Sequence, residues 1–120
     1  MDCILGRIIP LKPEKVYKVI FDETFLGEIA DHPKVDELLE EIDGDLSVAE
    51  KHLARDTVTK VHEERGVQIW RHKPGTDKQV RILYSPQGKE RWVVDSIPRR
   101  TDYRRNDLNT AIKRVLGKID

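Results

Sequence analysis

The chain has 120 residues, with 22 Lys and Arg, 22 Asp and Glu, and no formal net charge at pH 7. This length is typical of one domain that buries a core without metals, and the single cysteine, Cys3, excludes an intrachain disulfide framework. No apolar run reaches the roughly 20 residues of a membrane span, and the N-terminus lacks a signal-peptide pattern, so we expect a cytoplasmic protein.

The first part of the chain favours a strand followed by two helices. Residues 1–15 show no clear period and predict an irregular arm, whereas residues 16–21 alternate as a strand does. Asp22 is a suitable N-cap for a short helix. A second helix is predicted to begin at Pro33 and to end at Gly44. Its apolar stripe consists of Val35, Leu38, Leu39 and Ile42.

A further helix is predicted between Ser47 and Glu64. Ser47 and Glu50 have the spacing of a capping box, and Gly66 is a suitable residue to end the helix. Leu53, Thr57 and Val61 follow one another at four-residue intervals, as the residues on one face of a helix do. This interpretation adds a third helix to the N-terminal half.

After Gly66 the pattern changes to that of strands. Three strand-like runs occupy residues 67–73, 78–84 and 90–97, and the connectors between them have the length and composition of hairpin turns. They predict an antiparallel meander. A final helix is expected to end at Gly117. Its apolar stripe consists of Leu108, Ala111, Ile112, Val115 and Leu116.

The order of these elements predicts an α+β fold. We expect a small twisted antiparallel sheet with an N-terminal helical hairpin, of two or three helices, packed on one face, and a C-terminal helix. The whole chain, residues 1–120, is predicted to be a single domain. Its core spans residues 16–117, preceded by the irregular arm.

Charge divides the chain into two unlike halves. Residues 1–64 hold 8 Lys and Arg against 16 Asp and Glu, whereas residues 65–120 hold 14 against 6, so the halves carry −8 and +8. Such asymmetry favours a surface that binds a polyanion. The alternative is that acidic helices and a basic sheet pair with each other within the molecule.

Several basic residues are expected to meet at one end or face of the sheet. Arg71 and Lys73 are two residues apart on one run, Arg81 lies across the next turn, and Arg99 follows the last strand, with Tyr103 shortly after it. Arginine forks bind phosphate oxygens in pairs, and tyrosine can stack on a base. The pattern predicts a phosphodiester site without a metal; a solvated basic face is the alternative reading.

Other candidate sites have less support. The histidines at positions 32, 52, 62 and 72 are too widely spaced to chelate a metal, and we expect them to be structural or on the surface. Nucleotide-binding glycine motifs and the nucleophile motif of hydrolases are absent from the sequence. No cofactor is expected. The pairs Glu40–Glu41 and Glu63–Glu64 are assigned to the solvated faces of helices.

The basic half resembles the RelE/ParE superfamily of bacterial and archaeal toxins. The segments RGVQIWRHK, VRILYS and RWVVDSIPRRTDYRR, followed by an amphipathic helix, are similar to the family's strands and to its arginine- and tyrosine-rich end. VYKVIFDETFLGEIADHP resembles its opening strand and helix. The resemblance covers residues 16–117. It implies a toxin of a type II toxin–antitoxin system that cuts messenger RNA on the ribosome, without metal, through attack by the ribose 2′-hydroxyl.

The resemblance also assigns roles to individual residues. The catalytic set that it implies is Arg71, Lys73, Arg81, Arg99 and Tyr103. Lys73 or Tyr103 would help to remove the 2′-proton, Arg81 would stabilise charge on the phosphate, and the other two arginines would position the backbone. The RNA-binding set is Arg100, Arg104 and Arg105.

Some features depart from the family pattern. Ile97–Pro98 replaces the family's Gly-His or Gly-Lys, and the acidic stretch at residues 22–45 opposes ribosome binding. These departures leave two alternatives open, a gyrase inhibitor of the ParE type and a catalytically inactive RNA-binding member. The partners that the resemblance implies are a cognate antitoxin, the ribosome and messenger RNA.

Overall fold

Five strands form one open, mixed sheet in the order β1-β5-β4-β3-β2. The computed structural model describes residues 13–99 and 103–119; the predicted arm up to residue 12, with Cys3, and Arg100 lie outside this part. The strands are β1 (Lys18–Phe21), β2 (Val58–Glu64), β3 (Val67–His72), β4 (Val80–Gln87) and β5 (Glu90–Pro98). The helices are α2 (Glu23–Ile29), α3 (Val35–Leu46) and α4 (Arg105–Ile119), with a short 3₁₀ turn, η1 (Glu50–His52).

Strands β2 to β5 form an antiparallel meander, and β1 joins it in parallel beside β5. The predicted α+β fold is therefore confirmed, with a mixed sheet in place of a purely antiparallel one. Asp22 caps α2 as expected, because its carboxylate accepts hydrogen bonds from the N–H groups of Thr24 and Phe25.

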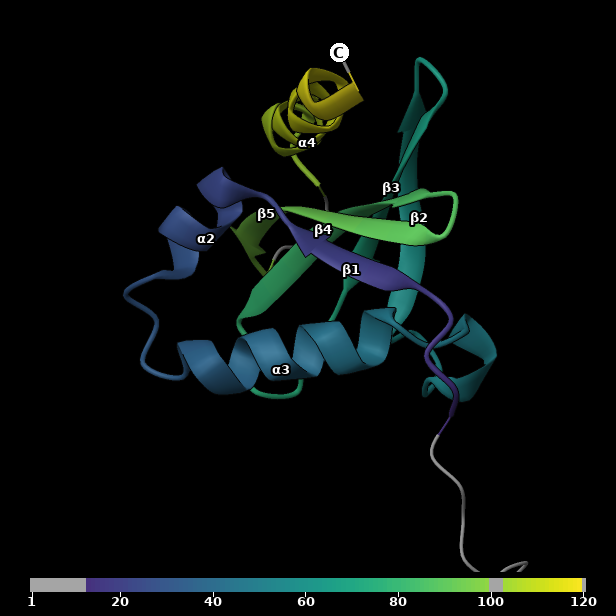
Figure 1. The fold of residues 1–120 in the computed structure, drawn as a ribbon. Helices are drawn as coiled ribbons and strands as arrows, with labels where there is room; N and C mark the ends of the chain where they lie inside the picture. Colours follow the sequence, from purple (N-terminus) through teal and green to yellow (C-terminus); the bar gives the residue numbers. More distant parts are fainter. Residues whose placement is uncertain (1–12, 100–102, 120) are drawn as a thin grey trace, which may run out of the picture.

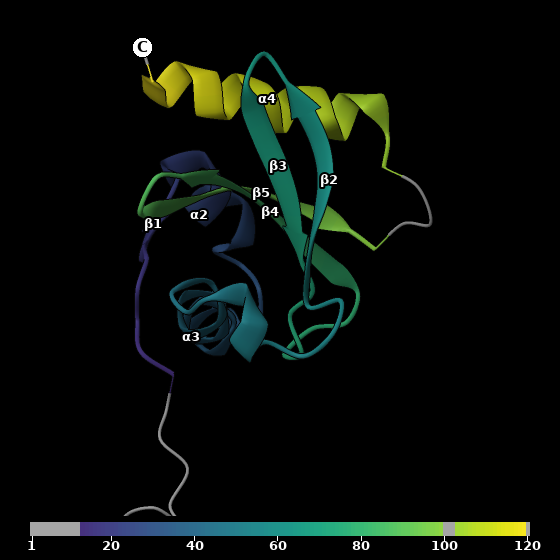
Figure 2. The same ribbon diagram turned by 90° about the vertical axis from the view of Figure 1, so that its right-hand side faces the viewer.

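Helices cover both faces of the sheet, with α2 and α3 on one side and α4 on the other (Figures 1 and 2). Strand β4 supplies apolar side chains to both interfaces. Ile82 and Tyr84 join the cluster beneath α2 and α3, while Leu83 joins the cluster beneath α4. All three are almost fully buried. Burial of apolar surface on both faces is the main source of stability in such a layered fold.

The helix predicted up to Glu64 is wrong. Residues 58–64 form β2, which pairs with β3, and only η1 is helical in this region. Arg65 and Gly66, both with positive φ, form a two-residue hairpin turn. The β-branched residues of β2 suit a strand better than a helix. His62, Glu63 and Glu64 are therefore on a strand, and His52 and His62 do not share a helix.

Two predicted helix ends are also wrong. Gly44 lies inside α3, which continues to Leu46, and Gly117 lies inside α4, which continues to Ile119. Packing of the flanking turns overrides the low helix propensity of glycine at both sites.

Among the described residues, no helix is long and apolar enough to cross a membrane.

We predict opposite effects for alanine at two glycines. Gly66→Ala should lower the free energy of unfolding by about 1–2 kcal/mol, because its φ of +77° strains an L-residue. Gly44→Ala should raise it by up to about 1 kcal/mol, because a methyl group there meets nothing within 4 Å and alanine favours helix. Urea unfolding of both variants measures the effects. Destabilisation by Gly44→Ala would contradict a continuous α3.

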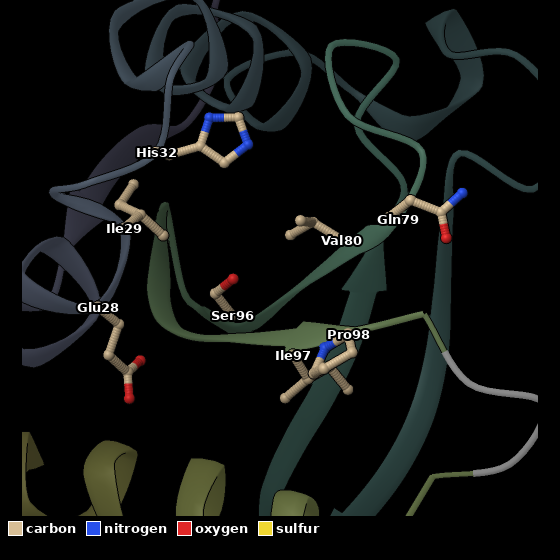
Figure 3. A pocket seen from close by; sticks show the side chains of 8 residues that line it. All are labelled: Glu28, Ile29, His32, Gln79, Val80, Ser96, Ile97 and Pro98. Carbon is tan, nitrogen blue, oxygen red and sulfur yellow. The ribbon is translucent and has the colours of Figure 1, made fainter.

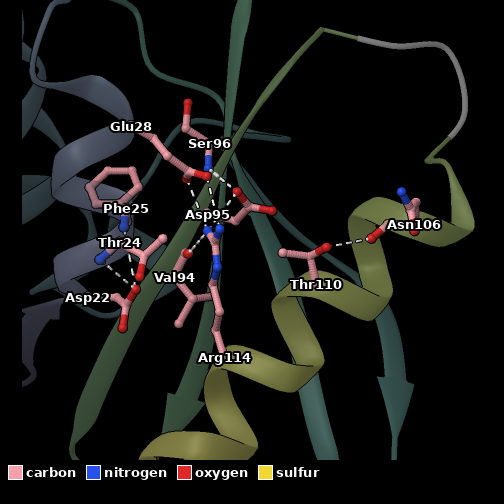
Figure 4. A network of polar contacts seen from close by, with 10 residues as sticks. All are labelled: Asp22, Thr24, Phe25, Glu28, Val94, Asp95, Ser96, Asn106, Thr110 and Arg114. Atoms are coloured by element: carbon pink, nitrogen blue, oxygen red, sulfur yellow. Dashed lines mark hydrogen bonds and ion pairs between the residues drawn. The ribbon is translucent and has the colours of Figure 1, made fainter.

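Arg114 of α4 connects three elements, as Figure 4 shows. Its Nη1 atom donates to the carbonyl oxygen of Val94 at 2.8 Å and to Asp95 at 3.1 Å, and its two terminal nitrogens bind Glu28 of α2 at 3.0 and 2.9 Å. Burial, followed by the negative charge of Glu28, raises the pKa of Asp95 to about 6. Arg114 opposes this shift without reversing it.

The raised pKa of Asp95 predicts a pH-dependent stability. The folded state favours the protonated carboxyl, so this contribution is complete below about pH 4 and is lost as the pH rises through 6. The free energy of unfolding of the wild type, relative to that of Asp95→Asn, should fall by about 1–3 kcal/mol between pH 4 and pH 7. Asp31→Asn, which removes one carboxylate from an exposed position, is the control against which the trend for Asp95→Asn is compared. A constant difference for Asp95→Asn would refute the assignment.

Candidate functional site

A basic depression lies where β4 begins and β5 ends. It is open, has a volume of about 250 Å³, and occupies the end of the sheet next to the loop between β3 and β4. Its lining residues are Lys73, Pro74, Gly75, Lys78, Arg81 and Arg99. Four cationic side chains thus line one small hollow, and Arg71 and Tyr103 lie near enough to act on the charge of Arg81.

The antiparallel meander explains this convergence. Arg71 is close to the end of β3, Arg81 is close to the start of β4, and Arg99 directly follows β5. The backbone N–H of Arg99 donates to the carbonyl of Gln79 at 2.8 Å, which fixes the end of β5 beside the start of β4. Hairpin pairing therefore brings cations from distant parts of the sequence to one end of the sheet.

The guanidinium of Arg81 is oriented by backbone carbonyl groups. Its Nη1 atom donates to Lys78 O at 3.1 Å and to Val80 O at 2.9 Å. Burial, and then the nearby charges of Arg99 and Arg71, lower the pKa of Arg81, although it stays charged at neutral pH. The positive charge of Arg81 is therefore repelled by the charges of Arg99 and Arg71, and a bound anion would reduce this repulsion.

Arg71 is held in a similar way on the neighbouring strand. Its Nη2 atom donates to Asp56 O at 3.1 Å and to the hydroxyl of Thr59 at 3.0 Å. Lys73 lies one residue beyond β3, and its backbone N–H donates to Thr57 O at 2.9 Å. These acceptors are neutral, so they orient the side chain of Arg71 and the backbone at Lys73 without cancelling the positive charge.

Tyr103 is partly buried at the rim of the α4 interface. Its ring packs against the apolar cluster that includes Ile97 and Ala111, just before α4 begins. It is not sealed in the interior. Arg104 and Arg105 follow it and are exposed, so they remain accessible to a ligand; Arg100 lies outside the described residues.

Two groups can be distinguished among the positive charges of the second half. The first group, which forms ion pairs with acids of the first half at 3.9, 3.3, 2.9 and 3.2 Å, is Arg65, Arg91, Arg114 and Lys118. Some basic residues of the second half therefore pair with acidic residues of the first half within the molecule, and others do not. Within residues 13–99 and 103–119, the second group forms no ion pair with a carboxylate. This group is Arg71, Lys73, Lys78, Arg81 and Arg99.

Three of the four histidines form side-chain contacts within the fold, and His52 is exposed. His72 is fully buried and its Nε2 lies 2.8 Å from Asp45 of α3. His32 contacts Asp77 at 2.7 Å, and His62 contacts Glu64 at 3.3 Å. The described part of the chain contains no group of three potential metal ligands.

A larger cavity, of about 330 Å³, lies on the α2 side of the same sheet end (Figure 3). Its lining is mostly apolar, from Ile29, Val80, Ile97 and Pro98. Its ionisable residues Glu28 and His32 are already engaged, the former by Arg114 and the latter by Asp77. This cavity therefore lacks the free charge that distinguishes the basic depression.

Sequence reasoning missed two residues of this region. Lys78 lines the depression, and its place at the start of the strand-like run that follows the short connector after Lys73 was a usable signal. Glu41 accepts hydrogen bonds from the N–H groups of Gly75 and Thr76, at 2.7 and 2.9 Å. No local pattern links Glu41 with a loop more than thirty residues away.

Comparison with known structures supports the fold. A crystal structure of an archaeal RelE–RelB complex from Pyrococcus horikoshii OT3 contains a chain that matches this one with a TM-score of 0.56 and 19% identity. The match covers 72% of this chain and 98% of that chain. No protein-family model and no curated protein matches the sequence. The architecture is therefore that of a small α+β protein with a RelE-like fold.

The depression should bind single-stranded polyanions through its unpaired cations. The logarithm of affinity for a short single-stranded RNA should fall linearly with the logarithm of salt concentration, and Arg81→Ala should reduce that slope by about 0.7. Lys89→Ala, which removes an exposed cation beyond the opposite end of β4, is the matched control. Fluorescence anisotropy measures both. Equal slopes for the two variants would exclude Arg81 from the interface.

Proposed function

We propose that this protein is a RelE-type toxin that cleaves messenger RNA on the ribosome without a metal ion. The observation that carries the proposal is the group of cations in and beside the basic depression, which have no carboxylate partner among the described residues. A diester phosphate needs such donors, and a transition state that gains negative charge needs them more. The fold shared with a chain of a RelE–RelB complex supports the same function.

The proposed chemistry uses the substrate's own hydroxyl. The ribose 2′-oxygen attacks the adjacent phosphorus, the bond to the 5′-oxygen breaks, and the products are a 2′,3′-cyclic phosphate and a 5′-hydroxyl. Lys73 or Tyr103 takes the 2′-proton, and Arg81 stabilises the charge that builds on the phosphoryl oxygens. Arg71 and Arg99 position the backbone, and a neighbouring arginine or lysine protonates or stabilises the leaving oxygen.

Residues beyond the depression extend the proposed RNA surface. Arg104 and Arg105 are exposed at the start of α4, next to Tyr103, and Arg100 precedes them in sequence. In this proposal they contact phosphates that flank the scissile bond. Lys78 joins the same surface because it lines the depression.

A second candidate is an RNA-binding member of the same fold that has lost catalysis. The packing of Tyr103 against the apolar cluster beneath α4 favours it, because a packing role leaves the phenol without a chemical one. In that case Arg81 and Arg99 still bind phosphate. The hydroxyl of Tyr103 then contributes nothing to turnover.

The proposed partner is an antitoxin that covers the basic depression. The structure with the matching fold is that of a RelE–RelB complex, and a toxin that cuts messenger RNA must be neutralised in its own cell. A helix or strand of the partner that carries carboxylates would satisfy the unpaired cations. This contact would block access to RNA by direct competition.

Expression of the chain alone in bacteria tests the function. We expect growth arrest with cleavage of messenger RNA within codons, mapped by primer extension. Arg81→Ala should slow cleavage by about 100-fold or more, because an electrostatic donor to the transition state is lost. Tyr103→Phe should also reduce cleavage, and Lys89→Ala should leave it unchanged.

The pattern of results separates the candidates. Normal cleavage by Tyr103→Phe alongside loss in Arg81→Ala would remove the tyrosine from the chemistry. RNA binding without cleavage by the wild type would favour the inactive member. Normal growth together with intact transcripts and no RNA binding would contradict both candidates.

A further inference from the structure

We propose that Glu41 of α3 is a positioning residue that holds the loop between β3 and β4 in the shape required by the basic depression. The two oxygens of its carboxylate accept from two consecutive backbone N–H groups, Gly75 at 2.7 Å and Thr76 at 2.9 Å. Hydrogen bonds from amides to a carboxylate are stronger than those to neutral acceptors. Helix α3, which belongs to the acidic half of the chain, therefore holds the loop between β3 and β4 through these two hydrogen bonds.

The loop that Glu41 holds forms one wall of the depression. It supplies Lys73 and Lys78 to the lining, and the carbonyl of Lys78 accepts one of the hydrogen bonds that orient the Arg81 guanidinium, at 3.1 Å. A change in the shape of the loop would therefore move Lys73 and Lys78. It would also break one of the hydrogen bonds that orient the guanidinium group of Arg81. Among the described residues, Glu41 forms no hydrogen bond or ion pair with a residue assigned to catalysis, so its proposed effect on the site runs through this loop.

A second contact anchors the same loop two residues further on. His32, which lies between α2 and α3, binds Asp77 through its Nε2 atom at 2.7 Å, and the other carboxylate oxygen of Asp77 accepts from Gln79 N at 2.8 Å. The N–H of Lys34 donates to Nδ1 of His32, so Nε2 carries the proton and donates to Asp77. Both ends of the segment from Gly75 to Gln79 are thus fixed.

Electrostatics makes the positioning role testable. Neutralising any carboxylate near a basic site should strengthen anion binding, or leave it unchanged, if charge alone matters. Loss of the loop contact should weaken binding. Glu41→Gln removes the charge and sets an NH₂ group against one of the two N–H donors. Glu40→Gln removes the same charge from an exposed neighbour that forms no hydrogen bond or ion pair with the described residues.

The experiment compares these two variants of the whole chain, using a fluorescent six-nucleotide 2′-O-methyl RNA that cannot be cleaved. We expect Glu41→Gln to weaken binding by about 3- to 10-fold relative to Glu40→Gln. Amide hydrogen exchange at Gly75 and Thr76 should accelerate in Glu41→Gln, and the Nε–Hε resonance of Arg81 should shift. Equal or tighter binding by Glu41→Gln, with a folded protein by circular dichroism, would overturn the proposal.

The RNA arm of this test rests on the proposed function, and the two can fail separately. If the wild type does not bind the oligonucleotide, the proposed function fails, while exchange at Gly75 and Thr76 and the Arg81 resonance still decide whether Glu41 holds the loop. If binding occurs but neither the exchange rates nor the resonance differ between the variants, the positioning role is refuted.

Discussion

Two guanidinium groups at the end of the sheet, those of Arg71 and Arg81, are held by neutral oxygens, and the candidate site depends on this. Arg81 donates to the carbonyl groups of Lys78 and Val80, and Arg71 donates to Asp56 O and to the hydroxyl of Thr59. A carboxylate partner would orient these side chains equally well, but it would also neutralise them. Carbonyl acceptors leave a group of like charges that an anionic ligand can stabilise.

The fold supplies those carbonyl groups from the first residue of β4 and from the segments that precede β2 and β4. Two layers of helices bury both faces, but α4 leaves the end of the sheet beside the β3–β4 loop uncovered. The acidic half of the chain packs behind this end. Its contacts with the loop run through backbone amides and a histidine, so the negative charge of α3 shapes the site without cancelling it.

The positions of the main cations follow from local sequence. Three strand-like runs joined by short turns place Arg71, Arg81 and Arg99 at one end of a meander, because each hairpin reverses the chain. Glu41 could not be found in this way. Its partner amides lie in a loop that only the packing of α3 against the sheet brings near.

Region 47–64 shows why local signals can mislead. Ser47 and Glu50 have the spacing of a capping box, and Val61 continues a four-residue repeat, yet the chain forms only a 3₁₀ turn there before β2. Hydrogen bonding with β3 and the turn at Gly66 decide the outcome, and both depend on residues outside the window in which the helix pattern occurs.

The most direct test of the proposal that the basic depression binds RNA phosphate is a crystal structure of the chain with a short 2′-O-methyl RNA. The account predicts a backbone phosphate in the basic depression, with an oxygen within hydrogen-bond distance of the guanidinium groups of Arg81 and Arg99. An oligonucleotide bound to another surface, with those two guanidinium groups still facing solvent, would contradict it.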